Sequence, residues 1–416
     1  MGDLAEIPGA IASRAAEMAE LLSSLVAIPS VSGQERAMTE FVAEWARRQG
    51  FAVDLWQADE DELARQYPLP PKFIPLSGRP TLVIQHRGTG GDAARSLMFN
   101  AHADVVAAPQ AQRWRFGPWS GTVHDGRLYG RGACDDKGPL VSALWAMQTI
   151  RQERIPLAGD LLLELVPGEE DCVALGTLTS VARGWRADGL VVLEPTESRP
   201  RCASRGGLRF EVTCLGTAIH GTVKWLGQDA IALLPSALQA LSRLEARWND
   251  RNADPLFAEY PLMRPITVDS VHGGQWQGML CDQVVCGGYL ELLPGDDLDH
   301  WKTKLIESVA AEMAAAGIAP DRVKVEIIES YHGHRTSPDH ALCRAAGKRD
   351  WSGFNSGCEA GLRWQILGTP TLVWGPGSLA QAHAVDEWVD FKETALVAEQ
   401  FTMLAAHFCQ PQIAER

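Results

Sequence analysis

The stretch LMFNAHADVV at residues 97–106 predicts an apolar strand whose end carries His102 and Asp104. Side chains two apart in a strand point to the same face, so these two groups are expected side by side. A neutral imidazole is a common metal ligand, and the Asp104 carboxylate could accept the second ring N–H of His102 and so fix its tautomer. We therefore expect a metal ligand where this strand ends.

A glycine-rich turn, GRGACDDKG at residues 130–138, contains the adjacent carboxylates Asp135 and Asp136. It comes directly before an apolar helical pattern over residues 139–150. Imidazoles and carboxylates are typical ligands of divalent cations in enzymes. The two stretches predict half of a metal site, although the residues alone do not decide between Asp135 and Asp136.

The surrounding sequence alternates between helical and strand patterns. Helices are expected near residues 8–28 and 35–48, where apolar residues recur with helical spacing. This alternation is typical of an α/β fold in which helices cover both faces of a sheet. Short apolar runs predict strands at residues 51–55, 81–85, 161–166 and 189–193.

The pattern changes near residue 206. Residues 208–215 alternate between apolar and polar side chains, which predicts a sheet with one solvated face. We expect an inserted α+β domain over residues 207–330 and a discontinuous α/β domain over residues 1–206 and 331–416. The later sequence predicts helices at residues 230–248, 298–315, 338–346 and 390–407, and strands at 284–293, 323–328 and 371–374.

Composition limits the kinds of partner and the compartment. The 416 residues carry a formal net charge of −14, so nucleic acid and anionic membrane surfaces would be repelled. Nine cysteines without a CxxC pair favour reduced thiols. The first residues lack an apolar signal-peptide core, and no apolar run reaches the roughly 18 residues of a membrane span. We expect a cytoplasmic protein that binds neither nucleic acid nor membranes.

Further candidate ligands follow later strands or lie near the end of the chain. Because sites in open α/β sheets form at the carboxyl ends of strands, these side chains could converge with His102. Taken singly, each has an ordinary alternative, since a strand-end carboxylate is often a helix N-cap or a solvated charge. Their convergence predicts a hydrolytic metal site in which one carboxylate is the general base. The candidates are Glu169 and Glu170, between which the residues do not decide, with Glu194 and His383.

The sequence resembles the M20 family of zinc-dependent amidohydrolases and peptidases in several ordered motifs, over most of the chain. The resemblance implies a metallopeptidase catalytic domain with a mixed sheet flanked by helices, plus an inserted lid and dimerisation domain. It also implies two divalent cations, Zn²⁺ in the first place and Co²⁺ or Mn²⁺ as alternatives. The motifs are HADVV at 102–106, GRGACDDKG at 130–138, EE at 169–170, LEPT at 193–196 and GPG at 375–377.

The resemblance also implies a role for each candidate. Asp135 would bridge the two cations, and Glu169 would be the general base and acid. Asp104 would orient His102. The remaining ligands would be His102 and Glu194 on one cation, and Glu170 and His383 on the other.

The inserted domain contains LGTAIHG at residues 215–221, which resembles the lid motif of the same family. This resemblance implies a homodimer formed through the lid domains. In that dimer His220 would reach the active site of the partner subunit and polarise the scissile carbonyl. The ordinary alternative is a turn histidine that precedes a helix.

One motif departs from the family pattern. Relatives carry Asp-x-Arg-x-x-Pro, with the arginine thought to bind a substrate carboxylate, where this chain has YLELLP at residues 289–294. Glu291 reverses that charge and puts a free-carboxylate substrate in doubt. Either another arginine replaces it, or the pocket accepts a neutral or cationic group. The candidate replacements are Arg205, Arg209 and Arg363, and Tyr289 and Asn355 are further candidates for the substrate pocket.

We expect an enzyme that removes an acyl group from an N-acyl amino acid or a related small N-acyl amine. Three alternatives stay open. A dipeptidase or carboxypeptidase could use the same site, and a binding protein could retain the fold without the chemistry. In the third, Cys134 beside the candidate bridge would be a nucleophile.

Overall fold

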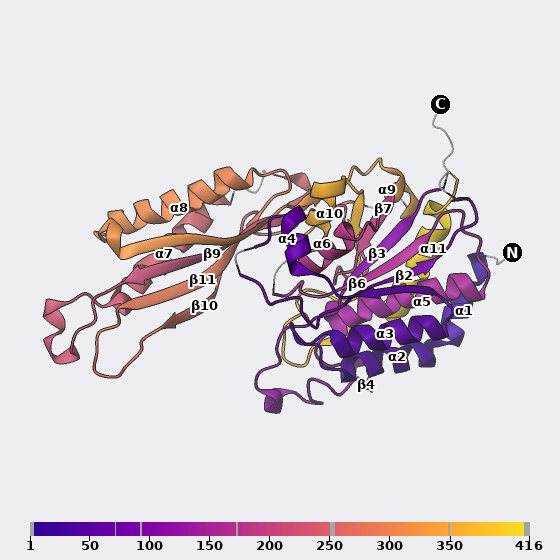
Figure 1. Ribbon diagram of the computed structural model, residues 1–416, viewed down its shortest axis with the longest axis horizontal. Helices are drawn as coiled ribbons and strands as arrows, with labels where there is room; N and C mark the ends of the chain where they lie inside the picture. The colour runs from indigo at the N-terminus through magenta and orange to yellow at the C-terminus, as the bar shows by residue number, and fades with distance from the viewer. Residues whose placement is uncertain are drawn as a thin grey trace.

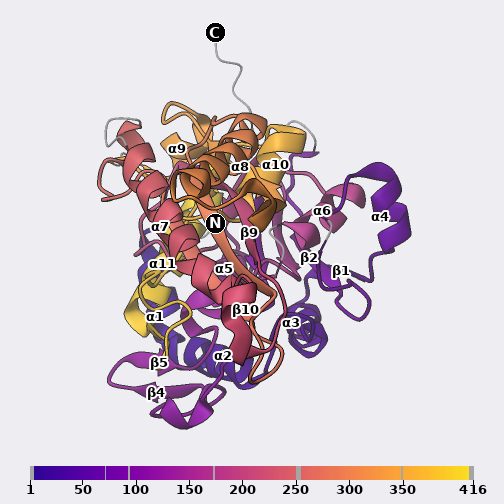
Figure 2. The same cartoon turned by 90° about the vertical axis from the view of Figure 1, so that its left-hand side faces the viewer.

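The computed structural model describes residues 4–70, 72–91, 94–171, 174–249, 254–347 and 350–411. Its ribbon shows a large lobe and a narrow lobe that projects from it (Figure 1). Seen along the narrow lobe, the helices α7 (Ala230–Trp248) and α8 (Leu298–Ala315) lie in front of the large lobe (Figure 2). The large lobe contains a six-stranded sheet and the narrow lobe a four-stranded sheet.

The six-stranded sheet forms the centre of the large lobe and has mixed pairing. Its four strands β6, β3, β7 and β15 are parallel, whereas the pairs β1–β2 and β2–β6 are antiparallel. The expected α/β class with a mixed, helix-flanked sheet is thereby confirmed. In spatial order the strands are β1 (Ala52–Trp56), β2 (Thr81–His86), β6 (Leu161–Val166), β3 (Leu97–His102), β7 (Gly189–Val192) and β15 (Thr371–Val373).

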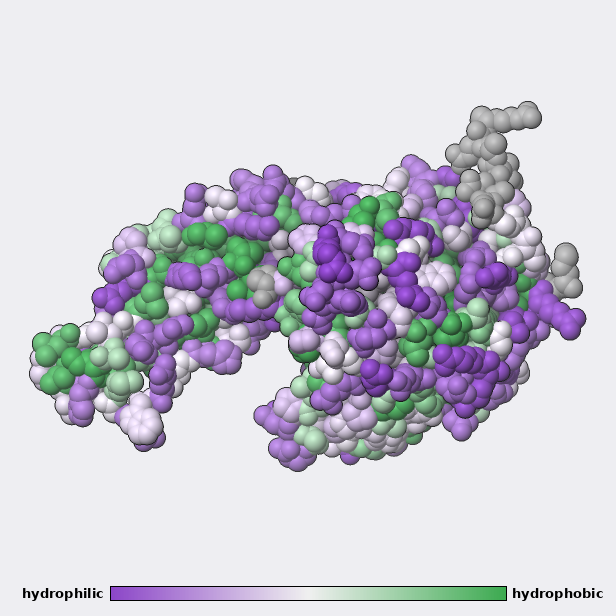
Figure 3. All heavy atoms as spheres, viewed as in Figure 1, coloured by the Kyte–Doolittle hydropathy of each residue, from purple (hydrophilic) through white to green (hydrophobic). Residues whose placement is uncertain are grey.

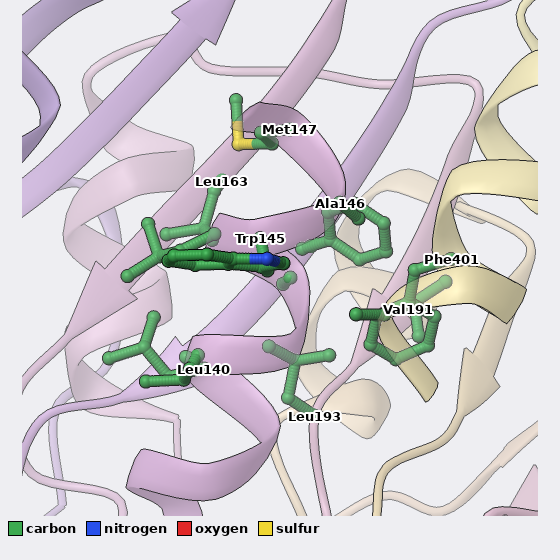
Figure 4. Close-up of a cluster of buried hydrophobic side chains, with 14 of the residues drawn as sticks. Leu140, Trp145, Ala146, Met147, Leu163, Val191, Leu193 and Phe401 are labelled. Atoms are coloured by element: carbon green, nitrogen blue, oxygen red, sulfur yellow. The ribbon is translucent and has the colours of Figure 1, made fainter. Parts of the chain in front are cut away.

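Alternate side chains of these strands enter a core on each face of the sheet. On one face Leu163 packs with Trp145 of α5, and Figure 4 shows the indole among leucines from helix and strand. On the other face Met98 and Leu162 form a smaller core with Ala360. The first face is covered by α1 (Ile7–Ser13), α2 (Ala15–Ala27), α3 (Arg36–Arg48), α5 (Gly138–Gln152) and α11 (Phe391–Phe408), and the second by α6 (Leu175–Ala182) and α10 (Ala360–Leu367).

The narrow lobe is an antiparallel sheet with both of its long helices, α7 and α8, on the same side (Figure 1). Leu208, Phe210 and Leu290 contribute to a core shared with these helices, separate from the core of the large lobe. In spatial order the strands are β10 (Ile266–Gly273), β11 (Gln283–Leu292), β9 (Gly206–Leu215) and β12 (Val323–Tyr331).

Three local expectations differ from the structure. The helix expected over residues 8–28 is divided at Arg14, where φ of −116° and ψ of 18° leave the helical region. The strand expected over residues 97–106 ends at His102. Strand β10 was not expected, because it is an edge strand whose exposed polar residues and bulge between Val268 and Ser270 break the alternation of apolar and polar side chains.

The helix expected over residues 338–346 is observed as the shorter α9 (Ala341–Ala345), and the other remaining elements are too short for a periodic pattern to predict. Among the described residues, no helix has the length and apolarity needed to cross a bilayer. The short helices are α4 (Glu60–Gln66) and α9 (Ala341–Ala345), and the short strands are β4 (Thr122–His124), β5 (Arg127–Tyr129), β8 (Ala203–Ser204), β13 (His334–Arg335), β14 (Gly353–Phe354) and β16 (Trp388–Asp390).

The predicted insertion does not separate cleanly from the large lobe. Its segment 254–263 contacts that lobe, since the Tyr260 hydroxyl donates a hydrogen bond to the carbonyl of Gly353 at 2.9 Å. The sheet of the narrow lobe itself spans residues 206–331. The boundaries at residues 207 and 330 stay a prediction.

Candidate active site

The predicted ligands lie where strands of the six-stranded sheet end. His102 is the last residue of β3, and Glu194 follows β7. Glu169 and Glu170 follow β6. Asp135 lies in the turn that leads into α5, and His383 in the segment between β15 and β16. Because β3, β6 and β7 are parallel neighbours, their carboxyl ends meet at one edge of the sheet.

Asp135 lies between the two histidines. Its Oδ1 is 2.9 Å from Nε2 of His102, and its Oδ2 is 3.6 Å from Nε2 of His383. The same nitrogen of His383 is 3.1 Å from Oε1 of Glu170. One ligand atom from each of His102, Asp135 and Glu170 lies within 4.8 Å of the other two. This arrangement places each oxygen of the Asp135 carboxylate beside a different histidine.

The contacts of His102 are compatible with a cation at this site. Its Nδ1 lies 2.9 Å from the backbone carbonyl of Asp104, which only accepts, so Nδ1 must carry the proton. Nε2 of a neutral ring then points a lone pair at a carboxylate oxygen of Asp135. Such a contact is favourable only when a proton or a metal ion lies between the two atoms. The donor set therefore fits a divalent cation.

The acidic side chains around Asp135 reinforce this conclusion. Burial raises the pKa of Glu169, Glu170 and Glu194, and mutual repulsion among the carboxylates raises it further. Within the described part of the chain, no lysine or arginine forms an ion pair with any of the four carboxylates. A cluster of this charge is stabilised when cations bind it.

The carboxylate of Asp104 has a different partner from the one expected. It is 3.8 Å from Nδ1 of His102, whose hydrogen bond goes to the Asp104 carbonyl instead. Oδ1 accepts the backbone N–H groups of Gly168 at 2.8 Å and Glu169 at 3.1 Å, and Oδ2 that of Glu170 at 3.0 Å. The chain leaves β3 directly after His102, and this turn brings the Asp104 carboxylate to the loop that carries both glutamates. Asp104 therefore positions that loop.

Asp136, which the sequence could not separate from Asp135, forms no hydrogen bond or ion pair with a histidine ring in the described structure. Its Oδ2 accepts the backbone N–H of His102 at 3.3 Å. Asp135, in contrast, lines a cavity of about 720 Å³ together with Glu169, Glu170 and other residues of the site. The geometry thus directs Asp135 and not Asp136 at the other candidate ligands.

Glu387 was missed, although it supports the turn that presents Asp135. Its carboxylate accepts the backbone N–H groups of Gly132, Cys134 and Asp135 at 2.9–3.1 Å and pairs with Arg131. It is 1% exposed and follows His383 by four residues. The sequence feature that could have pointed to Glu387 is its position four residues after the candidate ligand His383.

Cys134 lacks the properties of a nucleophile. It is fully buried, and burial together with neighbouring carboxylates raises the pKa of its thiol well above the usual value. Its Sγ donates to the carbonyl of Ser378. A reactive cysteine needs an accessible thiolate, so the structure argues against the cysteine-nucleophile alternative.

A second acidic group, Glu35, Asp104 and Asp171, has a structural explanation. Arg79 lies among these residues and pairs with Glu35 at 2.6 Å and with Asp171 at 2.7 Å. The arginine supplies the positive charge, and it ties the chain just after Glu170 to the core of the large lobe.

His220 lies outside the cavity of its own chain. It is the N-cap residue of η5 (Gly221–Leu226) in the narrow lobe, it is exposed, and its Nδ1 lies 2.8 Å from the hydroxyl of Thr222. Within one chain, therefore, it shares no contact with the residues around Asp135. The position agrees with the ordinary alternative of a turn histidine, and equally with a role in a partner's site.

The candidate substrate residues divide into two groups. Glu291, Tyr289 and Asn355 line the 720 Å³ cavity, as does Arg209. Arg205 does not, because its guanidinium is buried and donates to Oδ1 of Asn355 and to backbone carbonyls. Its expected role as a replacement carboxylate-binding residue is therefore not supported.

Arg363 is also occupied elsewhere. Its guanidinium donates to Glu164 at 3.0 Å and to Ser180 at 3.1 Å, and the side chains of Arg363 and Glu164 are 1% and 0% exposed. It cannot reach a substrate from this position. Its function is to neutralise a carboxylate buried in β6.

We expect Arg363→Met to lower the free energy of unfolding by about 3–5 kcal/mol, since it leaves the buried Glu164 carboxylate without its cation. Urea denaturation measures the loss. The control is Arg183→Met, which breaks a surface pair with Asp54 and should cost less than about 1 kcal/mol. Equal losses of unfolding free energy in the two variants would show that the buried pair contributes no more to stability than the surface pair.

Comparison with known proteins identifies the family. Residues 98–407 match Peptidase family M20/M25/M40. The chain belongs to this family. This match confirms the M20 resemblance, and the protein is accordingly a metal-dependent hydrolase of amide bonds. The alternative of a binding protein without chemistry is disfavoured, because a full set of candidate ligands is present.

Curated M20 relatives extend over almost the whole chain. An N-formyl-4-amino-5-aminomethyl-2-methylpyrimidine deformylase from Halalkalibacterium halodurans is 26% identical, with 94% of each chain covered. An acetylornithine deacetylase from Pectobacterium carotovorum is 28% identical over 94% of this chain and 97% of its own. Both names describe removal of an acyl group from an amine.

Solved structures share the fold. The dipeptidase Dug1p from Saccharomyces cerevisiae superposes with a TM-score of 0.79 over 99% of both chains, at 15% identity. Human carnosine dipeptidase 1 superposes with a TM-score of 0.76 over 98% of both chains, at 16% identity. At this identity the likeness is one of fold, and it extends through the narrow lobe.

Proposed function

We propose that this M20 hydrolase removes a short acyl group from a small N-acyl amine or N-acyl amino acid, with two divalent cations held by one shared carboxylate. The observation that carries the proposal is the position of Asp135, whose two oxygens face His102 and His383 separately. The carboxylates around it leave room for a substrate, because they line an open cavity.

The ligands divide around Asp135 into two sets. We assign His102 and Glu194 to one cation and Glu170 and His383 to the other, with Zn²⁺ as the first candidate and Co²⁺ or Mn²⁺ as alternatives. The contact between Glu170 and His383 supports the second set. When bound, such cations polarise the amide carbonyl and lower the pKa of a water molecule.

Glu169 is our candidate for proton transfer. Its backbone is held by Asp104, and its side chain lines the cavity beside Asp135 without contacting either histidine in the described structure. The carboxylate takes a proton from the attacking water and delivers it to the leaving amine. Burial favours the protonated form of the carboxyl, which suits it to the second of these steps.

The relatives support acyl removal over peptide cleavage as the first candidate. The two sequence relatives are named as a deacetylase and a deformylase, whereas the dipeptidases match at 15–16% identity and indicate the fold alone. A panel of N-acetyl and N-formyl amines against dipeptides tests this choice. Faster hydrolysis of the dipeptides by the metal-loaded enzyme would contradict it.

We further propose a homodimer formed through the narrow lobes, in which His220 completes the partner's active site. Exposed apolar side chains support this interface, since Trp225, Leu226 and Trp276 are 74%, 68% and 80% exposed. Figure 3 shows apolar side chains gathered at the free end of the narrow lobe. His220 belongs to the same end, because it pairs with Met279 in the loop that contains Trp276.

Mixing two inactive variants tests this role of His220. His220→Ala and Glu169→Gln are each expected to be inactive alone. After joint refolding, heterodimers contain one site with both wild-type residues, and activity should return to about a quarter of the wild-type value for random pairing. If His220 acted within its own chain, mixing would restore no activity.

We also propose that the enzyme works in the cytoplasm on small molecules. The described cysteines are all buried and unpaired, which agrees with a reducing compartment.

A further inference from the structure

One end of the active-site cavity is formed by the face of the narrow sheet that is turned away from α7 and α8. The strand register places Glu291 of β11 and Tyr331 of β12 on either side of Gly207 in β9. All three lie on the same face, because paired residues of adjacent strands point the same way. Two residues further along, the next row on this face contains Tyr289, Arg209 and Glu329.

Two glycines fix the Tyr331 ring against Glu291. A Cβ atom at Gly207 would lie 2.4 Å from the Tyr331 hydroxyl oxygen, and one at Gly357 would lie 2.2 Å from the ring. Both positions therefore need glycine for the ring to pass. The phenol crosses Gly207 and donates a hydrogen bond to Oε1 of Glu291 at 3.4 Å.

The second oxygen of Glu291 has no hydrogen-bond partner in the described structure. Glu291 is 5% exposed, and its Oε2 is buried and unpaired, yet the side chain lines the cavity. Burial raises the pKa of Glu291 to about 7, although the nearby charge of Arg205, the Tyr331 hydroxyl and the backbone N–H of Gly357 lower it. A buried carboxylate oxygen without a donor is costly, so a donor from a ligand would be stabilising here.

The charges at this end of the cavity are mainly negative. Besides the acidic residues assigned to the cations and to proton transfer, three other carboxylates line the cavity, those of Asp269, Glu291 and Glu329. Among the lining residues described, Arg209 is the single arginine or lysine, and it is exposed. A substrate carboxylate would be repelled, whereas a cation would be attracted.

We propose that Glu291 and Tyr331 bind a protonated amino or amidine-like group at the end of the substrate remote from the scissile amide. This inference rests on the proposed amide hydrolysis and names its substrate class, N-acyl amines that carry a second, cationic nitrogen. Oε2 of Glu291 accepts an N–H of the cation, and the Tyr331 hydroxyl holds the other carboxylate oxygen in place.

Three probes of matched length test the preference on the metal-loaded enzyme. They are N-acetyl-1,4-diaminobutane, N-acetylpentylamine and N-acetyl-5-aminopentanoate, which end in a cation, a methyl group and a carboxylate. We expect kcat/KM for the cationic probe to exceed that for the neutral probe by at least about tenfold, with the anionic probe lowest. An anionic probe hydrolysed as fast as the cationic one would overturn the proposal.

Substitutions assign the preference to one side chain. In Glu291→Gln the ratio of cationic to neutral kcat/KM should fall toward one, and Glu291→Arg should favour the anionic probe. Glu211→Gln is the matched control, because Glu211 lies further along the same strand as Gly207, pairs with Lys72 and is outside the cavity. Its ratio should equal that of the wild type. An unchanged ratio in Glu291→Gln would overturn the proposal.

A binding measurement tests the proposed cation site independently of the proposed hydrolysis. Calorimetric titration of the metal-loaded Glu169→Gln variant should show N-acetyl-1,4-diaminobutane binding about tenfold more tightly than N-acetylpentylamine, and Glu291→Gln in that background should remove the difference. If none of the probes is hydrolysed but this difference is found, deacylation is wrong and the cation site stands. Equal affinities, or no binding of either probe, would contradict the cation site itself.

Discussion

Glu169→Gln is expected to lower kcat by at least about a hundredfold while the protein retains its metal, because glutamine keeps the shape of the side chain but cannot accept a proton. The backbone N–H of residue 169 still donates to Asp104 in this variant, so the loop should keep its position. Steady-state kinetics on an N-acetyl amine and metal analysis of the same sample measure both quantities.

Glu211→Gln is the matched control for this substitution. Glu211 lies in β9, pairs with Lys72 and is outside the cavity, so its loss should leave kcat within a few fold of the wild type. Full activity in Glu169→Gln would contradict the assignment of the general base. Loss of metal from that variant would show instead that Glu169 is a ligand.

Asp135→Asn is expected to weaken the binding of both cations by well over tenfold, since changes outside the ligand shell already cost about 10–100-fold. A neutral amide at this position removes the negative charge that both histidines face. Metal content after dialysis against a buffered chelator measures the effect. The expected result is protein with less than one cation per chain.

Asp136→Asn provides the control within the same turn. Asp136 contacts the backbone N–H of His102 and not the ring, so this variant should retain its metal under the same dialysis. If Asp136→Asn lost its metal and Asp135→Asn kept it, the assignment of the bridge would be reversed.

Much of the large lobe follows from local sequence. The strands around β3 are continuous apolar runs buried on both faces, and their candidate ligands follow immediately after them. The periodic helix α5 of the large lobe, and α7 and α8 of the narrow lobe, were expected within two residues of their observed ends. The local pattern was sufficient to predict these elements, because the residues that the pattern marks as apolar are the ones that the fold buries.

The support of the site depends on contacts between distant segments. Asp104 is held by backbone groups 64–66 residues later, and Glu387 by a turn about 250 residues earlier. No local pattern contains such pairings. The sequence suggested the nearest partner for Asp104, the ring of His102, whereas the chain turns after β3 and brings the carboxylate to the loop after β6.

Two of the three arginine candidates lie outside the cavity for a related reason. Arg205 and Arg363 are both buried, and each is paired with groups contributed by other parts of the fold. Sequence position cannot distinguish an arginine that faces a ligand from one that neutralises a buried carboxylate. The departure at Glu291, in contrast, was visible in the motif itself, and the structure places that side chain in the cavity.

The central claim is that Asp135 joins two cation sites, and anomalous scattering from crystals grown with Zn²⁺ tests it most directly. Data collected on either side of the zinc absorption edge should show two peaks next to Asp135, one beside His102 and Glu194 and the other beside His383 and Glu170. A single peak, or peaks that do not contact Asp135, would contradict the claim.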